Sequence, residues 1–160
     1  MKTRIIPLKP TDLSFIEEVS NFLVNSFREF SPTWVPDIEA ARKKIDESFL
    51  KGRVSRILVD EDGKVLGWVA AIKDPHVWEI HPIAVPIEQQ RGGFGTLLIK
   101  EISNLAKCEG AAGIWAGTGD ETGATSLSTT DIYSDPVKQS LNSQPCQIIL
   151  QTFGLKAVLN

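Results

Sequence analysis

The sequence has 160 residues, 42% of them hydrophobic and 23% charged, with a formal net charge of −3 at neutral pH, which fits one domain, residues 1–160, with one core. This charge gives no basic face for nucleic acid, and no segment resembles a signal peptide or a membrane span. Two cysteines, Cys108 and Cys146, are too few for a disulfide framework and lack metal-ligand spacing, so we expect free thiols in a reducing cytoplasm and no metal site.

The first half of the sequence predicts a strand followed by two helices. Residues 5–8 are apolar and suit a short strand. Thr11 is expected to cap a helix over residues 12–30, in which apolar side chains recur at helical spacing. Residues 31–36 contain two prolines and end that helix, and residues 37–50 have the pattern of a second one.

The second half predicts mainly strands and loops around one long helix. A hairpin is expected with its turn at Asp62-Gly63. The predicted strands cover residues 54–59, 65–72, 77–85, 112–116 and 155–159, the predicted helices cover residues 96–108, 136–142 and 147–152, and residues 117–134 form a loop. We therefore predict an α/β fold: a single-domain mixed, partly antiparallel sheet of about six strands flanked by helices.

A glycine-rich turn at residues 90–95, with the sequence QRGGFG, separates the strand at 77–85 from the helix at 96–108. The first amides of a helix have no partner inside the helix, and the helix dipole adds partial positive charge there. Glycine lets this backbone approach a phosphate, and Arg91 adds a cation. The pattern indicates either a pyrophosphate site or a simple tight turn, and its spacing differs from the Rossmann and P-loop motifs.

The arrangement Gln90-x-x-Gly93-x-Gly95 matches the Q/R-x-x-G-x-G/A signature of the GNAT acetyltransferase superfamily, which binds acetyl-CoA. Over about residues 5–158 the sequence resembles the aminoglycoside 6'-N-acetyltransferases of this superfamily. The segments that carry the resemblance are Gly67-Trp68-Val69, residues 77–82 (VWEIHP), residues 117–121 (GTGDE) and residues 125–128 (TSLS). The resemblance implies acetyl-CoA as cosubstrate, a small cationic amine as acceptor, and a mixed sheet that splays where the cofactor enters.

The resemblance also implies how the cosubstrate is held. In the family, pantetheine pairs with the strand before the loop, and a backbone amide polarises the thioester carbonyl; here that amide belongs to Ala84 or Val85. The residues expected to bind the cofactor are Ile83, Ala84, Val85, Gln90, Arg91, Gly92, Gly93, Phe94, Gly95 and Thr96.

Two candidate catalytic residues lie on the strand before the loop. Glu79 and His81 point to one face because side chains alternate along a strand, whereas Trp78, Ile80 and Pro82 point to the other. Glu79 could bind the ammonium group of an acceptor and relay its proton, directly or through water, with His81 beside it. The alternative is an exposed strand carboxylate and a structural histidine, and the resemblance favours the catalytic roles.

Trp34 and Asp120 are candidate acceptor-binding residues. Trp34 lies in the loop bracketed by prolines and could stack on a sugar ring, or anchor the loop in the core. Asp120 matches the second of two aspartates that the resemblance implies for aminosugar binding, whereas Gly119 stands at the first, so one anionic contact is missing. Trp68 and Trp115 lie within predicted strands and are expected in the core.

The C-terminal end departs from the family pattern. Residues 149–155 match a helix whose tyrosine lies near the cofactor sulfur, but Leu150 stands at the tyrosine position and cannot donate a proton. The chain ends at Asn160, where the related enzymes continue into another strand; a natural shortening and a truncated gene both fit. A sheet without that strand has an unpaired edge that a second copy could cover, which would give a homodimer.

Three functions stay open on these grounds. The leading hypothesis is acetyl-CoA-dependent acetylation of the 6'-amine of aminoglycosides, by direct transfer in a ternary complex, because neither Cys108 nor Cys146 has a neighbouring base to activate it. The second is acetylation of another small amine, a polyamine or a peptide, which Gly119 and the C-terminal end favour. The third is a CoA-binding domain with little activity.

Overall fold

The computed structural model describes residues 1–28, 32–118, 147–152 and 155–158, with side chains described for residues 1–28 and 32–116. In this part of the chain one seven-stranded sheet carries the fold, with its strands in chain order. The strands are β1 (Thr3–Pro7), β2 (Arg53–Asp60), β3 (Val65–Ile72), β4 (Val77–Ala84), β5 (Gly113–Thr118), β6 (Gln147–Thr152) and β7 (Leu155–Val158). The helices are α1 (Leu13–Phe27), α2 (Ile38–Glu47) and α3 (Phe94–Cys108), with a 3-10 turn η1 (Ile87–Gln89).

The sheet is mixed, as predicted. Antiparallel pairs join β1 through β4, parallel pairs join β4 to β5 and β5 to β6, and β6 and β7 are antiparallel. Seven strands are present rather than about six because residues 147–152, predicted as a short helix, form β6 beside β5. Their Ile-Ile-Leu run suits a strand once a partner strand is available, which a local pattern does not show. The helix predicted over residues 136–142 lies outside the described residues.

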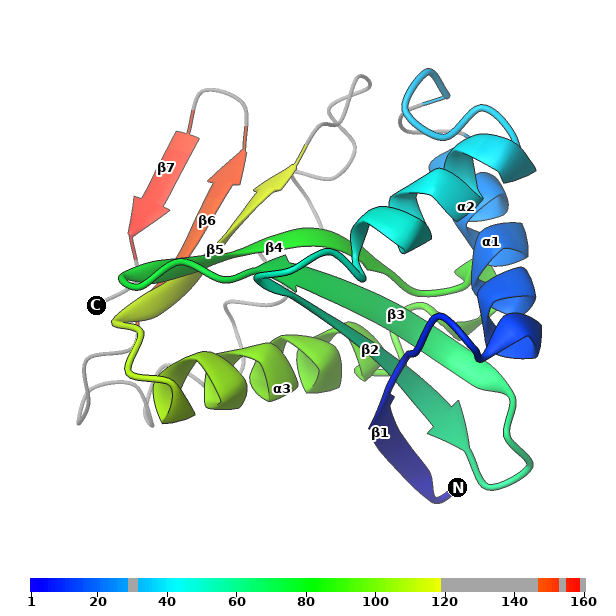
Figure 1. Ribbon diagram of the computed structural model, residues 1–160, viewed down its shortest axis with the longest axis horizontal. Helices are drawn as coiled ribbons and strands as arrows, with labels where there is room; N and C mark the ends of the chain where they lie inside the picture. Colours follow the sequence, from blue (N-terminus) through cyan, green and yellow to red (C-terminus); the bar gives the residue numbers. More distant parts are fainter. Residues whose placement is uncertain (29–31, 119–146, 153–154, 159–160) are drawn as a thin grey trace.

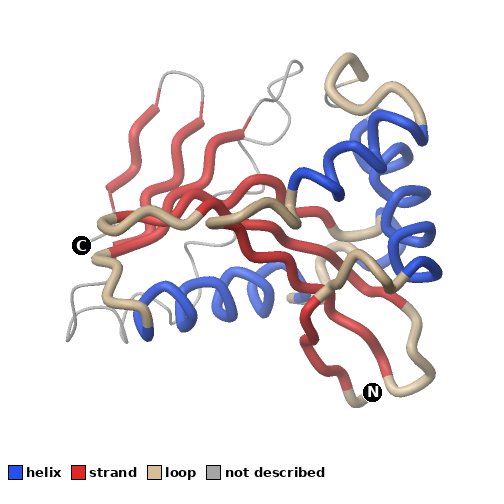
Figure 2. The backbone as a smooth tube through the Cα atoms, viewed as in Figure 1, coloured by secondary structure: helices blue, strands red, loops and turns tan. Residues whose placement is uncertain are grey.

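Helices lie on both faces of the sheet. α3 lies on one face, and α1 and α2 lie on the other (Figure 1), with the strands as the layer between them (Figure 2). The core under α3 contains Leu98, Ile102 and Trp78, and the core on the other face contains Leu23 and Trp68, all of them buried. No helix in the described part of the chain has the length and apolar character that crossing a bilayer requires.

The starts of α1 and α2 differ in their capping chemistry. α2 begins after Asp37, whose carboxylate accepts a hydrogen bond from the Ala40 amide at 2.8 Å. The cap predicted for the first helix at Thr11 is wrong, because the N-cap residue of α1 is Asp12. The Asp12 carboxylate does not cap the helix but accepts a hydrogen bond from the Lys9 amide at 2.9 Å, which closes the turn between β1 and α1.

β4 contains an irregularity that positions the candidate site. Val69 pairs with Ile83 and Ala71 pairs with Ile80, so two steps along β3 face three steps along β4. The extra residue of this β-bulge lies among the two residues between Ile80 and Ile83. Bulges bend a strand and re-aim its side chains. Accordingly, Ile83 packs against the core under α3, to which Ile80 also belongs, although strict alternation would place them on opposite faces.

β4 and β5 separate at the same level of the sheet. Their parallel pairing ends at Ile80 and Ala116, although both strands continue. Figure 1 shows the two strands starting side by side and then diverging. Within the described residues, no strand pairs with residues 81–84 on the β5 side of β4. Backbone donors and acceptors on this stretch are therefore available to a ligand.

Candidate active site

The glycine-rich loop forms the entrance to α3. Gly93 occupies the N-cap position with φ of 80° and ψ of 1°, a left-handed conformation that glycine adopts without steric cost. Arg91 also has a positive φ, of 65°, which is uncommon for a residue with a side chain. The first-turn amides of α3, from Phe94, Gly95 and Thr96, have no acceptor inside the helix. Together with the helix dipole they give this end of α3 a partial positive charge.

Side chains tie the loop to the end of β4. The Val85 carbonyl accepts hydrogen bonds from Gln90 Nε2 at 3.2 Å and from Ser26 Oγ at 3.3 Å. The backbone amide of Gln90 also donates to the Ile87 carbonyl at 3.3 Å. Gln90, predicted to bind the cofactor, therefore has its side chain engaged in holding the loop against the strand.

Close packing explains a second glycine of the loop. A Cβ atom added to Gly92 would lie 3.1 Å from Phe94 Cε2 and 3.3 Å from the Gln89 carbonyl oxygen. Phe94 itself is half-buried and packs against the core under α3. Gly92 thus allows the backbone to pack closely against Phe94 and Gln89, and Gly93 allows the left-handed turn before α3.

The ten predicted cofactor residues come together at one place. Ile83 and Ala84 lie on the stretch of β4 that β5 has left, Val85 follows, and the loop leads into the first turn of α3 at Thr96. This arrangement fits a phosphorylated cofactor with an extended amide arm. The free strand edge can pair with the amides of the arm, and the helix N-terminus with Arg91 suits a diphosphate.

A second group of side chains lies on the sheet face toward α1 and α2. Glu79 pairs with Trp115 of β5 on one side and with Ile72 of β3 on the other, and Ile72 pairs with Arg53 of β2. Because paired residues point to the same face, these four side chains form one row across four strands. All four are partly exposed, whereas Trp78, the neighbour of Glu79, is buried under α3.

Trp34 extends this face from the loop between α1 and α2. Its ring centroid lies 5.7 Å from that of His81 and 4.6 Å from that of Phe27, and both contacts are edge-to-face. Trp34 is half-buried, and with Phe27 it packs against the core on this side of the sheet. Trp34 is therefore a loop anchor that also reaches His81, and its sugar-binding role stays a prediction.

Charged groups surround His81 on the same face. Burial lowers the pKa of His81 below its ordinary value; the Glu79 carboxylate opposes this, the Lys44 and Arg53 cations reinforce it, and Glu47 opposes it weakly. The charged imidazolium of His81 is therefore disfavoured, and the neutral ring has a nitrogen that can accept a proton. Glu79 makes no salt bridge within the described residues, so its carboxylate is available to an ammonium group.

Three residues of this face were not predicted. Trp115 was expected in the core, but it is partly exposed and shares the face of Glu79. The signal was present, because its buried neighbours Ile114 and Ala116 take the opposite face. Lys44 and Arg53 gave no such signal, since only the packing of α2 and the register of β2 bring them to the site.

Other predicted residues do not enter this geometry. Asp120 and Gly119 lie outside the described residues, so the acceptor role of Asp120 stays a prediction. Leu150 lies in β6 rather than in the helix that the resemblance implied, and its backbone pairs with that of Ala116.

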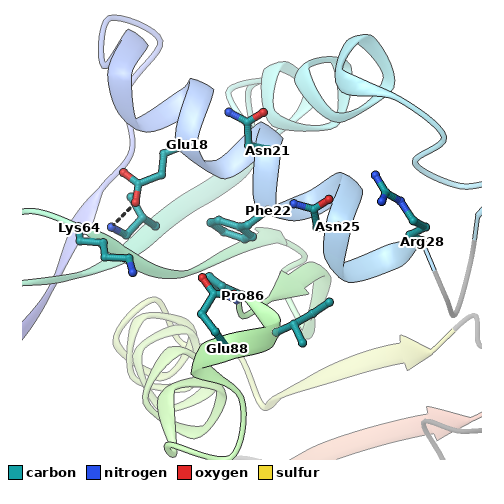
Figure 3. Close-up of a pocket in the computed structure, with 10 residues that line it drawn as sticks. Glu18, Asn21, Phe22, Asn25, Arg28, Lys64, Pro86 and Glu88 are labelled. Carbon is teal, nitrogen blue, oxygen red and sulfur yellow. Dashed lines mark hydrogen bonds between the residues drawn. The ribbon is translucent and has the colours of Figure 1, made fainter.

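A separate groove of about 500 Å³ lies between α1, the start of β3 and η1. None of the predicted site residues lines it. Phe22 lies near its middle, with Glu18 and Lys64 toward one end and Arg28 toward the other (Figure 3). The Glu18 carboxylate accepts a hydrogen bond from the Val65 amide at 2.9 Å, which is a structural role. The groove is therefore separate from the candidate site on the β4 face.

Solved structures of similar fold include three acetyltransferases. An aminoglycoside 6'-N-acetyltransferase crystallised with coenzyme A is 19% identical with a TM-score of 0.57, covering 68% of this chain and 57% of that chain. The ribosomal-protein-S18-alanine N-acetyltransferase of Escherichia coli is 18% identical with a TM-score of 0.57, covering 81% and 76%. AAC(6')-Iy with a bisubstrate analogue is 13% identical with a TM-score of 0.61, covering 82% and 90%. At these identities the likeness shows the fold alone.

A comparison with curated protein sequences finds no match. The family model described as "Acetyltransferase (GNAT) family" matches residues 17–127, which is more than half of the chain. The matched region contains β4, the glycine-rich loop and α3, the elements that build the candidate active site. The chain therefore belongs to the GNAT family of acetyltransferases.

Proposed function

We propose that this chain transfers the acetyl group of acetyl-CoA to the 6'-amine of an aminoglycoside or a similar aminosugar, by direct transfer in a ternary complex. The observation that carries the proposal is the arrangement around β4, whose free edge and following loop adjoin the face that bears Glu79 and His81. The 6'-N-acetyltransferases of similar fold support this acceptor. Such an activity would confer antibiotic resistance, and the free thiol of Cys108 suits a cytoplasmic location.

Backbone groups hold acetyl-CoA in this proposal. The diphosphate binds the first-turn amides of α3 and Arg91, and the pantetheine arm runs along residues 81–84 of β4. The amide of Ala84 or Val85 donates to the thioester carbonyl oxygen and stabilises the negative charge that develops there. One such donor typically contributes about 100-fold or more in rate.

The acceptor amine binds at Glu79. The carboxylate attracts its ammonium form, which must lose a proton before the nitrogen can attack the thioester carbon. Glu79 relays that proton, directly or through water, and neutral His81 is a second acceptor for it. The new C–N bond forms, the C–S bond breaks, and the thiolate takes a proton from water, since Leu150 cannot supply one.

Thiol release from acetyl-CoA in the presence of kanamycin-type amines tests this proposal. We expect release that requires both substrates, together with a product that carries the acetyl group on the 6'-nitrogen. The absence of release above background with every aminoglycoside tested would remove this acceptor class.

One observation favours a second acceptor class. Lys44 Nζ lies 5.4 Å from the centroid of the Trp34 ring, so a cation of the protein already occupies the face of this ring. This favours a small amine or a peptide amino group over a polycation, and the alanine N-acetyltransferase with the same TM-score shows that the fold does not choose between them. A panel of amines separates the two classes. Tight acetyl-CoA binding by calorimetry with no amine acetylated would instead support a CoA-binding domain with little activity.

A further inference from the structure

Lys44 places a cation beside the sheet face that bears Glu79 and His81, where the acceptor is proposed to bind. Its ammonium lies 5.4 Å from the Trp34 ring centroid, and that ring lies 5.7 Å from the His81 ring. Glu47, one helical turn further along α2, pairs with Lys44 at 3.6 Å, and only 24% of the Lys44 side chain is exposed. The ammonium is therefore held near the ring by a carboxylate and by the aromatic face.

Arg53 brings a second cation to the same face. It begins β2 and lies in the cross-strand row that contains Glu79, two strand spacings or roughly 10 Å away along the sheet. Arg53 makes no salt bridge within the described residues. Both cations act on His81, where they reinforce the effect of burial on its pKa. Their fields therefore reach the place where the acceptor is proposed to bind.

The Lys44 and Arg53 cations are expected to attract or repel any charged substituent that an acceptor carries beside its reacting amine. In the proposed function Glu79 is engaged by that amine, and Glu47 is already paired with Lys44. We infer that Lys44, assisted by Arg53, determines acceptor specificity by charge: a neutral or acidic substituent beside the reacting amine is favoured, and a second ammonium group is disfavoured. The inference rests on the proposed function and narrows it to aminosugars that carry no second ammonium group beside the reacting amine, because it assigns the selectivity of the same site.

Three acceptors that differ only in one substituent test this inference. Each is a methyl 6-amino-6-deoxyglucoside, and the substituent at C2 of the sugar is a hydroxyl, an amine or a carboxymethyl ether. The ratio kcat/KM is measured by thiol release at low and at high salt for the wild type, Lys44→Met, Lys44→Arg and Arg53→Met. Lys43→Met is the matched control, because Lys43 is an exposed neighbour on α2. Thermal melting verifies that each variant is folded.

We expect the wild type to prefer the carboxymethyl and hydroxyl compounds over the diamine. For a partly exposed cation, Lys44→Met should raise kcat/KM for the diamine about three- to fivefold and lower it for the carboxymethyl compound by a similar factor. Arg53→Met should act in the same direction, and Lys44→Arg should keep the wild-type order. High salt should reduce the wild-type preference, since screening weakens charge interactions but not steric ones.

An equal effect of Lys44→Met on all three acceptors would overturn the inference, as would a preference that salt does not change. If the wild type acetylates none of the three, thiol release with kanamycin-type amines decides the proposed function separately, and binding of the three compounds to the CoA-bound protein is measured by calorimetry to test the charge ranking. A Kd order that is the same in the wild type and in Lys44→Met would overturn the charge ranking separately.

Discussion

Glu79 of β4 and Trp115 of β5 are paired in the parallel part of the sheet, so the carboxylate and the indole point to the same face. The next pair, Ile80 with Ala116, is the last before the strands separate. The candidate catalytic carboxylate therefore lies immediately before the stretch of β4 that is free to bind a cosubstrate. One short strand can thus serve two substrates, with side chains toward the amine and backbone toward the thioester.

Replacing Glu79 by Gln should lower kcat/KM for amine acetylation by about 100-fold, because the ammonium loses its counter-charge and its proton relay. The affinity for acetyl-CoA should not change, since the cosubstrate is proposed to bind beyond Ile80. Thiol-release kinetics and calorimetry measure the two effects. Glu61→Gln, in the exposed turn after β2, is the control. A fall in both parameters would assign Glu79 a structural role instead.

The proposed role of the glycine-rich loop in cofactor binding is tested by replacing glycine with alanine at either end of α3. Gly93 and Gly110 both have positive φ, of 80° and 84°, and a Cβ atom added at either position would meet no heavy atom within 4 Å. Alanine at either position should therefore cost about 1 kcal/mol of stability. Only Gly93→Ala should weaken acetyl-CoA binding, at least about fivefold by calorimetry, because only that end of the helix is proposed to receive the diphosphate. Equal affinities in the two variants would contradict the cofactor assignment.

His81 should make the protein sensitive to acid. Its pKa is lowered in the folded state, mainly by burial, so below about pH 6.5 the unfolded chain binds the proton more readily than the folded one. Wild-type stability should therefore fall relative to His81→Gln as the pH drops below this value, and the two should keep a constant difference above it. Melting temperatures between pH 5 and pH 8 measure this, with His76→Gln as the exposed control. Parallel profiles would show that His81 is not desolvated.

The approximate positions of the strands and helices up to residue 116 were readable from the sequence, because they depend on local patterns. β5 continues to Thr118, where a loop was predicted. The alternation in β4 placed Glu79 and His81 on one face, and the strand–glycine–helix order located the loop before α3. The turn at Gly92 and Gly93 was predicted from the same pattern, since a tight turn and a helix start depend on residues close in sequence.

The bulge in β4, the position of Lys44 beside Trp34, and β6 could not be predicted from local sequence patterns. The register shift between Val69 and Ala71 depends on how β3 and β4 pair, and local alternation does not encode pairing. Lys44 reaches Trp34 only because α2 packs on the sheet face of His81. β6 was predicted as a helix because its parallel partner, β5, is distant in sequence.

Gly67 provides a test of how the sheet core supports the site. A Cβ atom at this position of β3 would lie 2.9 Å from Leu98 Cδ1 and 3.2 Å from the Ala84 carbonyl oxygen. The Leu98 side chain can move, but Ala84 is backbone at the end of β4, so Gly67→Ala should destabilise the fold by about 1–3 kcal/mol. Thermal melting should show a loss of about 2–4 °C per kcal/mol, and acetyl-CoA affinity should fall because the end of β4, which is proposed to bind the thioester, is displaced. The second substitution Leu98→Val removes the clashing methyl group and should restore part of the stability but not the affinity. If it restores both, the contact with Ala84 has no influence on the cofactor edge of β4.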